Sequence, residues 1–207
     1  KKIEEYHIRT NIPKNHMLFK GEEWGDTWRA GIHQGIKYWT DFYTKANLII
    51  LCSVYEKILA YSEDERIKKA LYFWFTASQS RLHRMNRYSP QHSIHVGPMA
   101  NTYYISPTPA EISPFYFMEA KIKDLKYDFV GTKRSVNSIV SATKILLKNN
   151  SIDYIFTDPP FGSNIMYSEL NFLSESWLKV YTNNKTEAIE SKAQNKSILN
   201  YQNLMTD

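Results

Sequence analysis

Two stretches in the first half of the chain carry apolar residues at the spacing of an amphipathic helix. The first runs from about residue 44 to residue 60, and Thr44 is its predicted N-cap. The second runs from about residue 62 to residue 86 and begins with Ser62 and Glu65, which have capping-box spacing. Because the link between them is short, we expect an antiparallel helical hairpin. The residues expected to face inward are Leu48, Ile49, Leu51, Cys52, Tyr55, Ile58, Leu59, Ala70, Leu71, Phe73, Trp74, Ala77 and Leu82.

The pattern changes in the last third of the chain. Residues 152–156 (Ile-Asp-Tyr-Ile-Phe) are mostly apolar and strand-prone, which predicts a buried strand. Pro159 and Pro160 lack N–H donors, so that strand must end before them. A polar turn at 162–164 follows. Helical spacing returns from Glu169 onward, through Leu170, Leu173, Trp177 and Leu178.

Weaker signals divide the rest of the chain. Residues 1–40, with Trp24 and Trp28, predict an extended arm that packs on the core or covers a site. A strand candidate lies at 101–106, and Ser113-Pro114 predicts a helix start that runs to about residue 127. The remaining expected elements are a basic loop at 128–137, a short strand at 136–142, a helical turn at 143–148, a break at Asn149-Asn150 and polar helical segments over 185–206.

These elements predict an α/β fold with three parts. An extended arm spans 1–40, a mainly helical segment spans 41–130, and an α/β segment that carries the candidate site spans 131–207. The chain of 207 residues has no run of 18 apolar residues, so no membrane span is expected. Its single cysteine, Cys52, excludes an internal disulfide and a cysteine-based zinc site. With no signal peptide visible at the start, a cytoplasmic protein is expected.

Charge is distributed unevenly along the chain. The net charge is +5, but residues 151–207 carry four Lys against seven Asp and Glu, and the rest of the chain is strongly basic. A basic first part suits a protein whose phosphate contacts lie outside its reaction site. Many bacterial proteins from AT-rich genomes are also rich in lysine without any such partner.

Asp158-Pro159-Pro160-Phe161 forms a corner suited to the chemistry of an amine. In open α/β sheets ligands bind at the carboxyl ends of strands, where Asp158 is expected to lie. An exocyclic amine conjugated to an aromatic base is a poor nucleophile, and acceptors that bind its N–H groups help to free its lone pair. The Asp158 carboxylate and the Pro159 carbonyl are two such acceptors, and Phe161 offers a face for base stacking.

The tetrapeptide resembles the (Asp/Asn/Ser)-Pro-Pro-(Tyr/Phe) motif of the amino-group DNA methyltransferases, which modify adenine N6 or cytosine N4. The longer run "DYIFTDPPFGSNIMYSELNFLSESWLK" is similar to that of large bacterial DNA methylases. Weaker similarity continues upstream through Trp28, Gly31, Gly35 and "DFYTKANLIIL", and downstream into "KSILNYQNLM". Only residues 151–180 are sharply specific.

The resemblance implies a Rossmann-like, S-adenosyl-L-methionine-dependent methyltransferase sheet with a helical N-terminal portion. It makes Asp158, Pro159, Pro160 and Phe161 the expected catalytic residues, and Asp158 and Phe161 expected contributors to the cofactor site. DNA is the expected partner, with Asn164 and Tyr167 among its contacts, and a restriction-modification context is implied. Adenine N6 is favoured over cytosine N4.

One expected feature is absent from the sequence. Methyltransferases of this kind hold the donor with a Gly-rich turn between a strand and a helix, and none of the seven glycines forms one. We therefore expect this chain to be a central fragment whose partner is the remainder of the methyltransferase chain, which carries that turn. Two alternatives remain open: a nucleic-acid-binding fragment without turnover, and a methylase of RNA or of a protein amide.

Two further groups of residues are candidates for binding. Arg81, Arg84 and Arg87 lie three apart at the end of the second predicted helix, which indicates either a phosphate-binding stripe or a solvated helix end. His92 and His95 have His-x-x-His spacing in a predicted loop over 89–100. Since no third or fourth ligand has suitable spacing, no metal site is expected.

Overall fold

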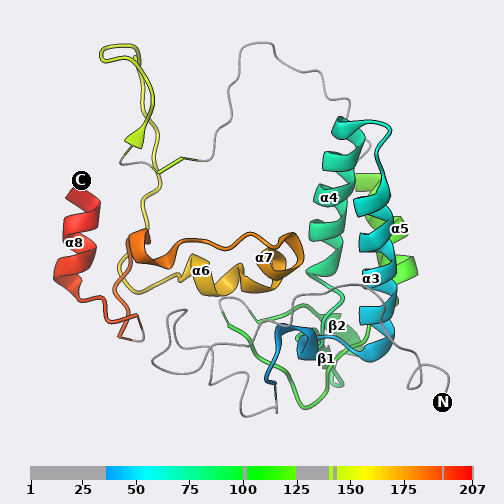
Figure 1. The fold of residues 1–207 in the computed structure, drawn as a ribbon. Helices are drawn as coiled ribbons and strands as arrows, with labels where there is room; N and C mark the ends of the chain where they lie inside the picture. The colour runs from blue at the N-terminus through cyan, green and yellow to red at the C-terminus, as the bar shows by residue number, and fades with distance from the viewer. Residues whose placement is uncertain (1–35, 100–101, 125–139, 142–143, 193, 207) are drawn as a thin grey trace.

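A computed structural model describes residues 36–99, 102–124, 140–141, 144–192 and 194–206. Within these ranges the protein contains both α and β structure, as helices and a small antiparallel sheet of two strands (Figure 1). The arm predicted over 1–40, up to residue 35, lies outside the described residues, as do the basic loop and most of the strand predicted at 136–142. None of the described helices could span a bilayer as a long apolar segment.

The N-terminal helices form the predicted antiparallel hairpin. After the short 3-10 helix η1 (Trp39–Phe42), helix α3 spans Lys45–Ala60 and helix α4 spans Glu65–Gln79. The two run side by side in opposite directions, and α5 (Pro114–Asp124) lies against both (Figure 1). The predicted start of α5 at Ser113-Pro114 is confirmed, because the Phe117 N–H donates to the Ser113 carbonyl.

The helix starts agree only in part with the sequence prediction. Thr44 caps α3 as expected, since its side chain accepts a hydrogen bond from the Asn47 N–H. The capping box predicted from Ser62 and Glu65 is wrong. Asp64 caps α4 instead, because its carboxylate accepts bonds from the Arg66 and Ile67 N–H groups at 2.7 and 3.4 Å.

Helix α4 ends at Gln79, seven residues before the predicted end near residue 86. Residues 80–86, which follow the helix, form turns that hydrogen bonds stabilise. The Asn86 side-chain amide donates to the Arg81 and His83 carbonyls, and the Arg84 N–H donates to the Phe42 carbonyl at 2.6 Å. These bonds use the polar groups that a longer helix would have satisfied internally.

The inward face of the two helices is also rotated from the prediction. On α4, Phe73 is 63% exposed, whereas Phe75, which the prediction left out, is fully buried. On α3, Leu51, Cys52, Tyr55 and Ile58 are buried as predicted, but Leu59 is 43% exposed. The spacing alone could not show which side of α4 another element would cover.

A β-hairpin replaces the loop predicted over 89–100. Strand β1 (Arg87–Ser89) pairs antiparallel with β2 (Ile94–Val96), with Tyr88 opposite His95. The candidate strand at 101–106 is not a strand where it is described, from residue 102 onward, although Tyr103 and Ile105 are buried.

The C-terminal part consists of short helices. Helix α6 (Tyr167–Leu170) and helix α7 (Phe172–Leu178) meet at Asn171, and α7 ends on Lys179 in the left-handed conformation (φ 58°). The 3-10 helix η3 (Asn184–Thr186) and helix α8 (Ile198–Thr206) follow. The helix predicted from Glu169 is confirmed in part: the chain is helical there but is divided at Asn171, and Leu173 and Trp177 are buried whereas Leu178 is exposed.

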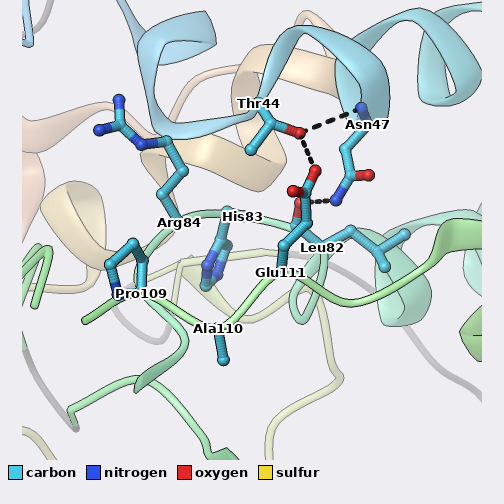
Figure 2. A pocket seen from close by; sticks show the side chains of 8 residues that line it. All are labelled: Thr44, Asn47, Leu82, His83, Arg84, Pro109, Ala110 and Glu111. Atoms are coloured by element: carbon cyan, nitrogen blue, oxygen red, sulfur yellow. Dashed lines mark hydrogen bonds between the residues drawn. The ribbon is translucent and has the colours of Figure 1, made fainter. Parts of the chain in front are cut away.

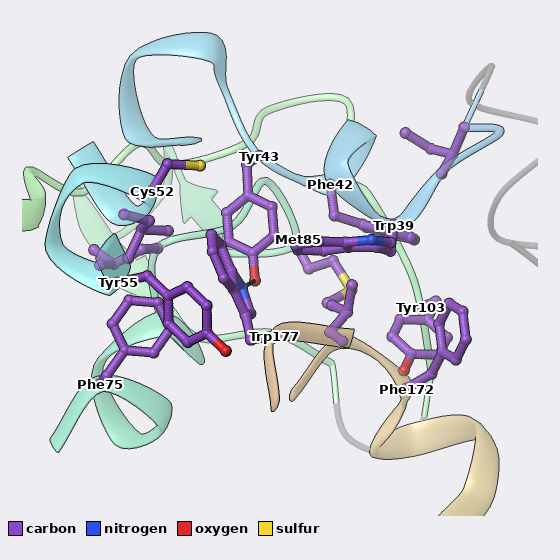
Figure 3. Packing of buried hydrophobic residues seen from close by; sticks show 14 of the residues in the cluster. Trp39, Phe42, Tyr43, Cys52, Tyr55, Phe75, Met85, Tyr103, Phe172 and Trp177 are labelled. Carbon is purple, nitrogen blue, oxygen red and sulfur yellow. Dashed lines mark hydrogen bonds between the residues drawn. The ribbon is translucent and has the colours of Figure 1, made fainter. Parts of the chain in front are cut away.

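Trp177 on α7 lies at the centre of an aromatic core built from distant parts of the chain (Figure 3). Its ring centroid lies 4.9 Å from that of Trp39, 5.0 Å from that of Phe75 and 5.6 Å from that of Tyr55. Its indole N–H donates to the Tyr43 hydroxyl at 3.1 Å, and that hydroxyl donates to Gln79 at 2.6 Å. Burial raises the pKa of Tyr43. The core thus joins α7 to η1, α3 and α4.

Replacing Trp177 with alanine should lower the free energy of unfolding by about 3–5 kcal/mol, because a fully buried aromatic side chain leaves a cavity. The matched control is Phe73→Ala on the exposed face of α4, which should change the free energy of unfolding by less than about 0.5 kcal/mol. Urea unfolding followed by circular dichroism measures both variants. A loss equal to that of the control would contradict the central position of Trp177.

Candidate functional site

The segment before the proline corner is not a strand in the structure. Residues 151–160 form neither helix nor strand, and Tyr154, Ile155 and Phe156 are largely exposed, Phe156 by 84%. The segment lies apart from helices α3, α4 and α5 (Figure 1). The buried strand predicted at 152–156 is therefore wrong for the described chain, because no described segment pairs with its backbone. A strand with apolar residues on both faces needs neighbours on each side.

The corner itself closes with a tight turn. The Asn164 N–H donates to the Phe161 carbonyl at 2.9 Å, and Gly162 has a φ of +47°. A side chain at position 162 would meet nothing within 4 Å, so glycine is favoured there by its backbone conformation rather than by lack of space. This turn reverses the chain just after the two prolines.

Two hydrogen bonds hold the corner against the C-terminal segment. The Tyr201 hydroxyl on α8 donates to the Pro160 carbonyl at 2.7 Å. The Glu190 N–H donates to the Gly162 carbonyl at 3.1 Å. By contrast, no described residue donates a hydrogen bond to the Pro159 carbonyl or to the Asp158 carboxylate. The two groups predicted as amine acceptors thus remain available.

The corner borders a cavity of about 700 Å³. Asp158 and Pro160 form one side, and Tyr167 at the start of α6 also lines it. Glu175 of α7 and residues 180–183 and 186–188 complete the wall, together with residues 140, 141 and 165. This volume is typical of a small-molecule site.

Two other carboxylates that line the cavity accept hydrogen bonds from residues of the chain. Glu175 accepts hydrogen bonds from the backbone N–H and the hydroxyl of Thr182. Glu187 accepts them from the backbone N–H of Ser168 at 3.0 Å and from its hydroxyl at 2.5 Å. Among the three carboxylates that line the cavity, Asp158 is therefore the one that accepts no hydrogen bond from the described residues.

The structure brings only some of the predicted site residues to this cavity. Asp158, Pro160 and Tyr167 line it. Phe161 is 71% exposed and does not line the cavity, and Asn164 is also exposed. Pro159 lies between the two lining residues of the corner. The predicted aromatic face is therefore present beside the corner but open to solvent.

Tyr201 and Glu190 are site residues that sequence reasoning missed. Tyr201 lies 41 residues after the carbonyl to which it donates, and Glu190 acts through its backbone. Neither hydrophobic spacing nor the tetrapeptide gives a signal for such bonds. Only the folded chain shows that the C-terminal helix reaches the corner.

The three predicted nucleic-acid-binding arginines do not form a helical stripe, because α4 ends before them. The Arg81 guanidinium packs against Gly97, and Arg87 donates from Nε to the Gly97 carbonyl at 3.1 Å. Arg84 instead donates to the Asp41 carbonyl at 3.3 Å. Arg81 and Arg87 thus converge on one residue, whereas Arg84 points elsewhere.

Arg84 belongs to a second, smaller cavity of about 130 Å³ (Figure 2). Thr44 donates to the Glu111 carboxylate at 2.5 Å, and the Asn47 amide donates to the Leu82 carbonyl at 3.0 Å. The Arg84 side chain extends away from Glu111. The polar groups around this cavity mainly bind one another, so it is a junction between α3 and the segment before α5.

His83 also lines the small cavity and is only 6% exposed. Its Nδ1 has no hydrogen-bond partner among the described residues. Burial lowers its pKa from 6.5 to about 4, with a smaller contribution from the positive charge of Arg81. The folded protein therefore keeps this imidazole neutral.

No group of three or more His, Cys, Asp or Glu side chains in the part of the chain that the structure describes could hold a metal ion. His95 lies opposite Tyr88 in the hairpin, with the ring centroids 5.9 Å apart, and His92 is in the exposed loop.

The free energy of unfolding should fall as the pH is lowered from 6.5 to 5. The unfolded chain binds a proton at His83 near pH 6.5, but the folded chain binds it only near pH 4, so acid favours unfolding. The expected loss over this window is about 1.5 kcal/mol. Urea unfolding at several pH values, compared with His83→Gln, measures it; an equal loss in the variant would contradict the assignment.

Comparisons of the chain with protein-family models, with curated proteins and with solved structures find no match in any of the three.

Proposed function

We propose that this chain supplies the amine-binding corner of an S-adenosyl-L-methionine-dependent DNA methyltransferase. The substrate would be the exocyclic amine of a base turned out of the duplex, with adenine N6 favoured over cytosine N4. The observation that carries the proposal is the Asp158-Pro159-Pro160-Phe161 corner, whose carboxylate borders a cavity and receives no hydrogen bond from the described residues.

The chemistry proposed for the corner is hydrogen bonding to the amine. The Asp158 carboxylate accepts one N–H and the Pro159 carbonyl accepts the other, so the nitrogen lone pair is drawn out of conjugation with the ring. Two acceptors fixed in advance stabilise the charge that develops on the nitrogen and need no rearrangement during the reaction. The proline rings fix the backbone on which both acceptors depend.

The bonds around the corner support this role. Tyr201 holds the Pro160 carbonyl and Glu190 holds the Gly162 carbonyl, so the chain is fixed on the C-terminal side of both acceptors. Neither bond uses the Pro159 carbonyl. Tyr201 would therefore be a positioning residue that does not itself touch the amine. Phe161, exposed beside the turn, offers a face on which the extruded base can stack.

The methyl donor needs residues beyond those described. Gly97 and Gly162 are the glycines within the described ranges, and neither begins a helix after a strand. The described residues therefore do not form a donor site by themselves. We propose that the remainder of a methyltransferase chain carries the Gly-rich turn. Asp158 and Phe161 stay candidate contributors to that site.

The remainder of the methyltransferase chain would also complete a Rossmann-like sheet. Residues 152–156 are mostly apolar, exposed and unpaired along their backbone within the described chain. A central strand of a covered parallel sheet has this composition, and it would place Asp158 at a carboxyl end. The exposure of these side chains supports the proposal that another part of the sheet covers them.

A second candidate function is nucleic-acid binding without turnover. The lack of a Gly-rich turn favours it, since a chain that cannot hold the donor cannot transfer a methyl group. Methylation of RNA or of a protein amide is a further alternative, because the corner recognises an NH2 group and not the polymer that bears it. Incorporation of labelled methyl groups into DNA, RNA and protein distinguishes these three.

Asp158→Ala in the full-length protein should abolish methyl transfer to DNA, with a loss of at least about 10²-fold in kcat, because one of two fixed acceptors is removed. The matched control is Glu63→Ala, an exposed carboxylate in the link between α3 and α4, which should retain the wild-type rate. Transfer of labelled methyl groups to duplex DNA is the measurement. A wild-type rate in Asp158→Ala, with the fold intact by circular dichroism, would refute the proposal.

A further inference from the structure

The stretch from residue 80 to residue 110 is positively charged through arginine and carries no acidic residue. It holds three of the seven arginines. In the chain as a whole, by contrast, 19 of the 26 basic residues are lysines. Because arginine forks fit phosphate oxygens in pairs of hydrogen bonds, a local excess of arginine is more informative than the net charge.

Two of these arginines meet at Gly97, just after strand β2. A side-chain carbon at position 97 would lie 2.0 Å from Arg81 Nη1, so the guanidinium occupies the space that glycine leaves open. The Nε of Arg87 donates to the Gly97 carbonyl at 3.1 Å. Among the described residues, no carboxylate pairs with either guanidinium. Two neighbouring cations without a counter-ion form a site for a polyanion.

The hairpin that carries Arg87 has a fixed base and an open tip. At the base, the Tyr88 N–H donates to the Thr108 carbonyl at 3.0 Å, and the Thr108 hydroxyl donates to the Tyr88 carbonyl at 3.2 Å. The tip, residues 90–93, is exposed and includes Gln91 and His92. Polar side chains that can donate and accept hydrogen bonds are thus presented on a two-stranded ribbon.

We propose that the β1–β2 hairpin is a duplex-DNA-binding element, with Arg81 and Arg87 on phosphates at its base and the tip in the major groove. This deepens the proposed function and rests on it for the choice of DNA. A two-stranded ribbon fits the major groove of B-form DNA, whereas the major groove of A-form RNA is too narrow for side chains to enter. Arg84 takes no part, since it binds the Asp41 carbonyl.

The test is binding of the full-length protein to a fluorescent 20-base-pair duplex, followed by anisotropy between 50 and 200 mM salt. The variant is Arg81→Gln/Arg87→Gln. The matched control is Arg66→Gln/Lys69→Gln, which removes the same charge from the exposed start of α4. At 0.1 M salt each phosphate contact contributes a factor of roughly eight, so affinity should fall by roughly tenfold to 60-fold and the salt slope by about two.

A second variant keeps the hairpin bond intact. Arg81→Glu leaves the Arg87–Gly97 hydrogen bond in place and should still weaken DNA binding, with an unchanged thermal unfolding midpoint. Equal losses in the hairpin variant and in the α4 control would overturn the inference, as would unchanged affinity in both hairpin variants. Binding of duplex RNA as tight as that of duplex DNA would overturn the major-groove assignment.

The outcomes separate this inference from the proposed function. Asp158→Ala should leave the salt slope of duplex-DNA binding unchanged, because the corner makes none of the phosphate contacts assigned to the hairpin. DNA binding through the hairpin without any methyl transfer would contradict the proposed function alone. Methyl transfer by a protein whose hairpin variants bind DNA normally would contradict the hairpin assignment alone.

Discussion

The packing of Trp177 against the N-terminal aromatic residues is the interaction on which the described structure depends. Helix α7 is short, with seven residues, and a helix of that length is not stable alone in water. Contacts with Trp39, Phe75 and Tyr55 keep it in place, and Gln79 adds a hydrogen bond to Ser174 at 2.7 Å. Without these contacts, α7 would no longer be held against the N-terminal helices, and α6 and residues 179–183 on either side of it would lose their attachment to the core.

The candidate site follows from that support. Tyr167 of α6 and Glu175 of α7 form part of the cavity wall. The Tyr103 hydroxyl, which is buried in the core, donates to the Glu169 and Leu170 carbonyls of α6, and Trp177 holds α7 in the core. The corner itself has no such packing and is held by the bonds from Tyr201 and Glu190. The two acceptors proposed for the amine are thus exposed beside a cavity whose wall includes residues of α6 and α7.

The sequence predicted local features better than those that depend on distant partners. Thr44 and Pro114 act through neighbouring residues, and the structure confirms both. The spacing of Leu173 and Trp177 predicted that both are buried, but not which distant residues bury them. Phe73 and the strand at 152–156 were predicted to be buried, but burial depends on what covers a residue, which spacing does not show. The corner was identified from four consecutive residues. The hydrogen bond from Tyr201 to the corner was not predicted, since the two lie far apart in the chain.

Recognition of the amine itself is the most direct test of the role proposed for the corner. Full-length protein should bind a duplex with an unpaired target adenine more tightly, by roughly tenfold, than one with purine, which lacks the amine, because two hydrogen bonds to Asp158 and Pro159 are lost. The Asp158→Ala variant should lose most of that difference. Equal affinity of the wild-type protein for adenine and purine would contradict amine binding at the corner.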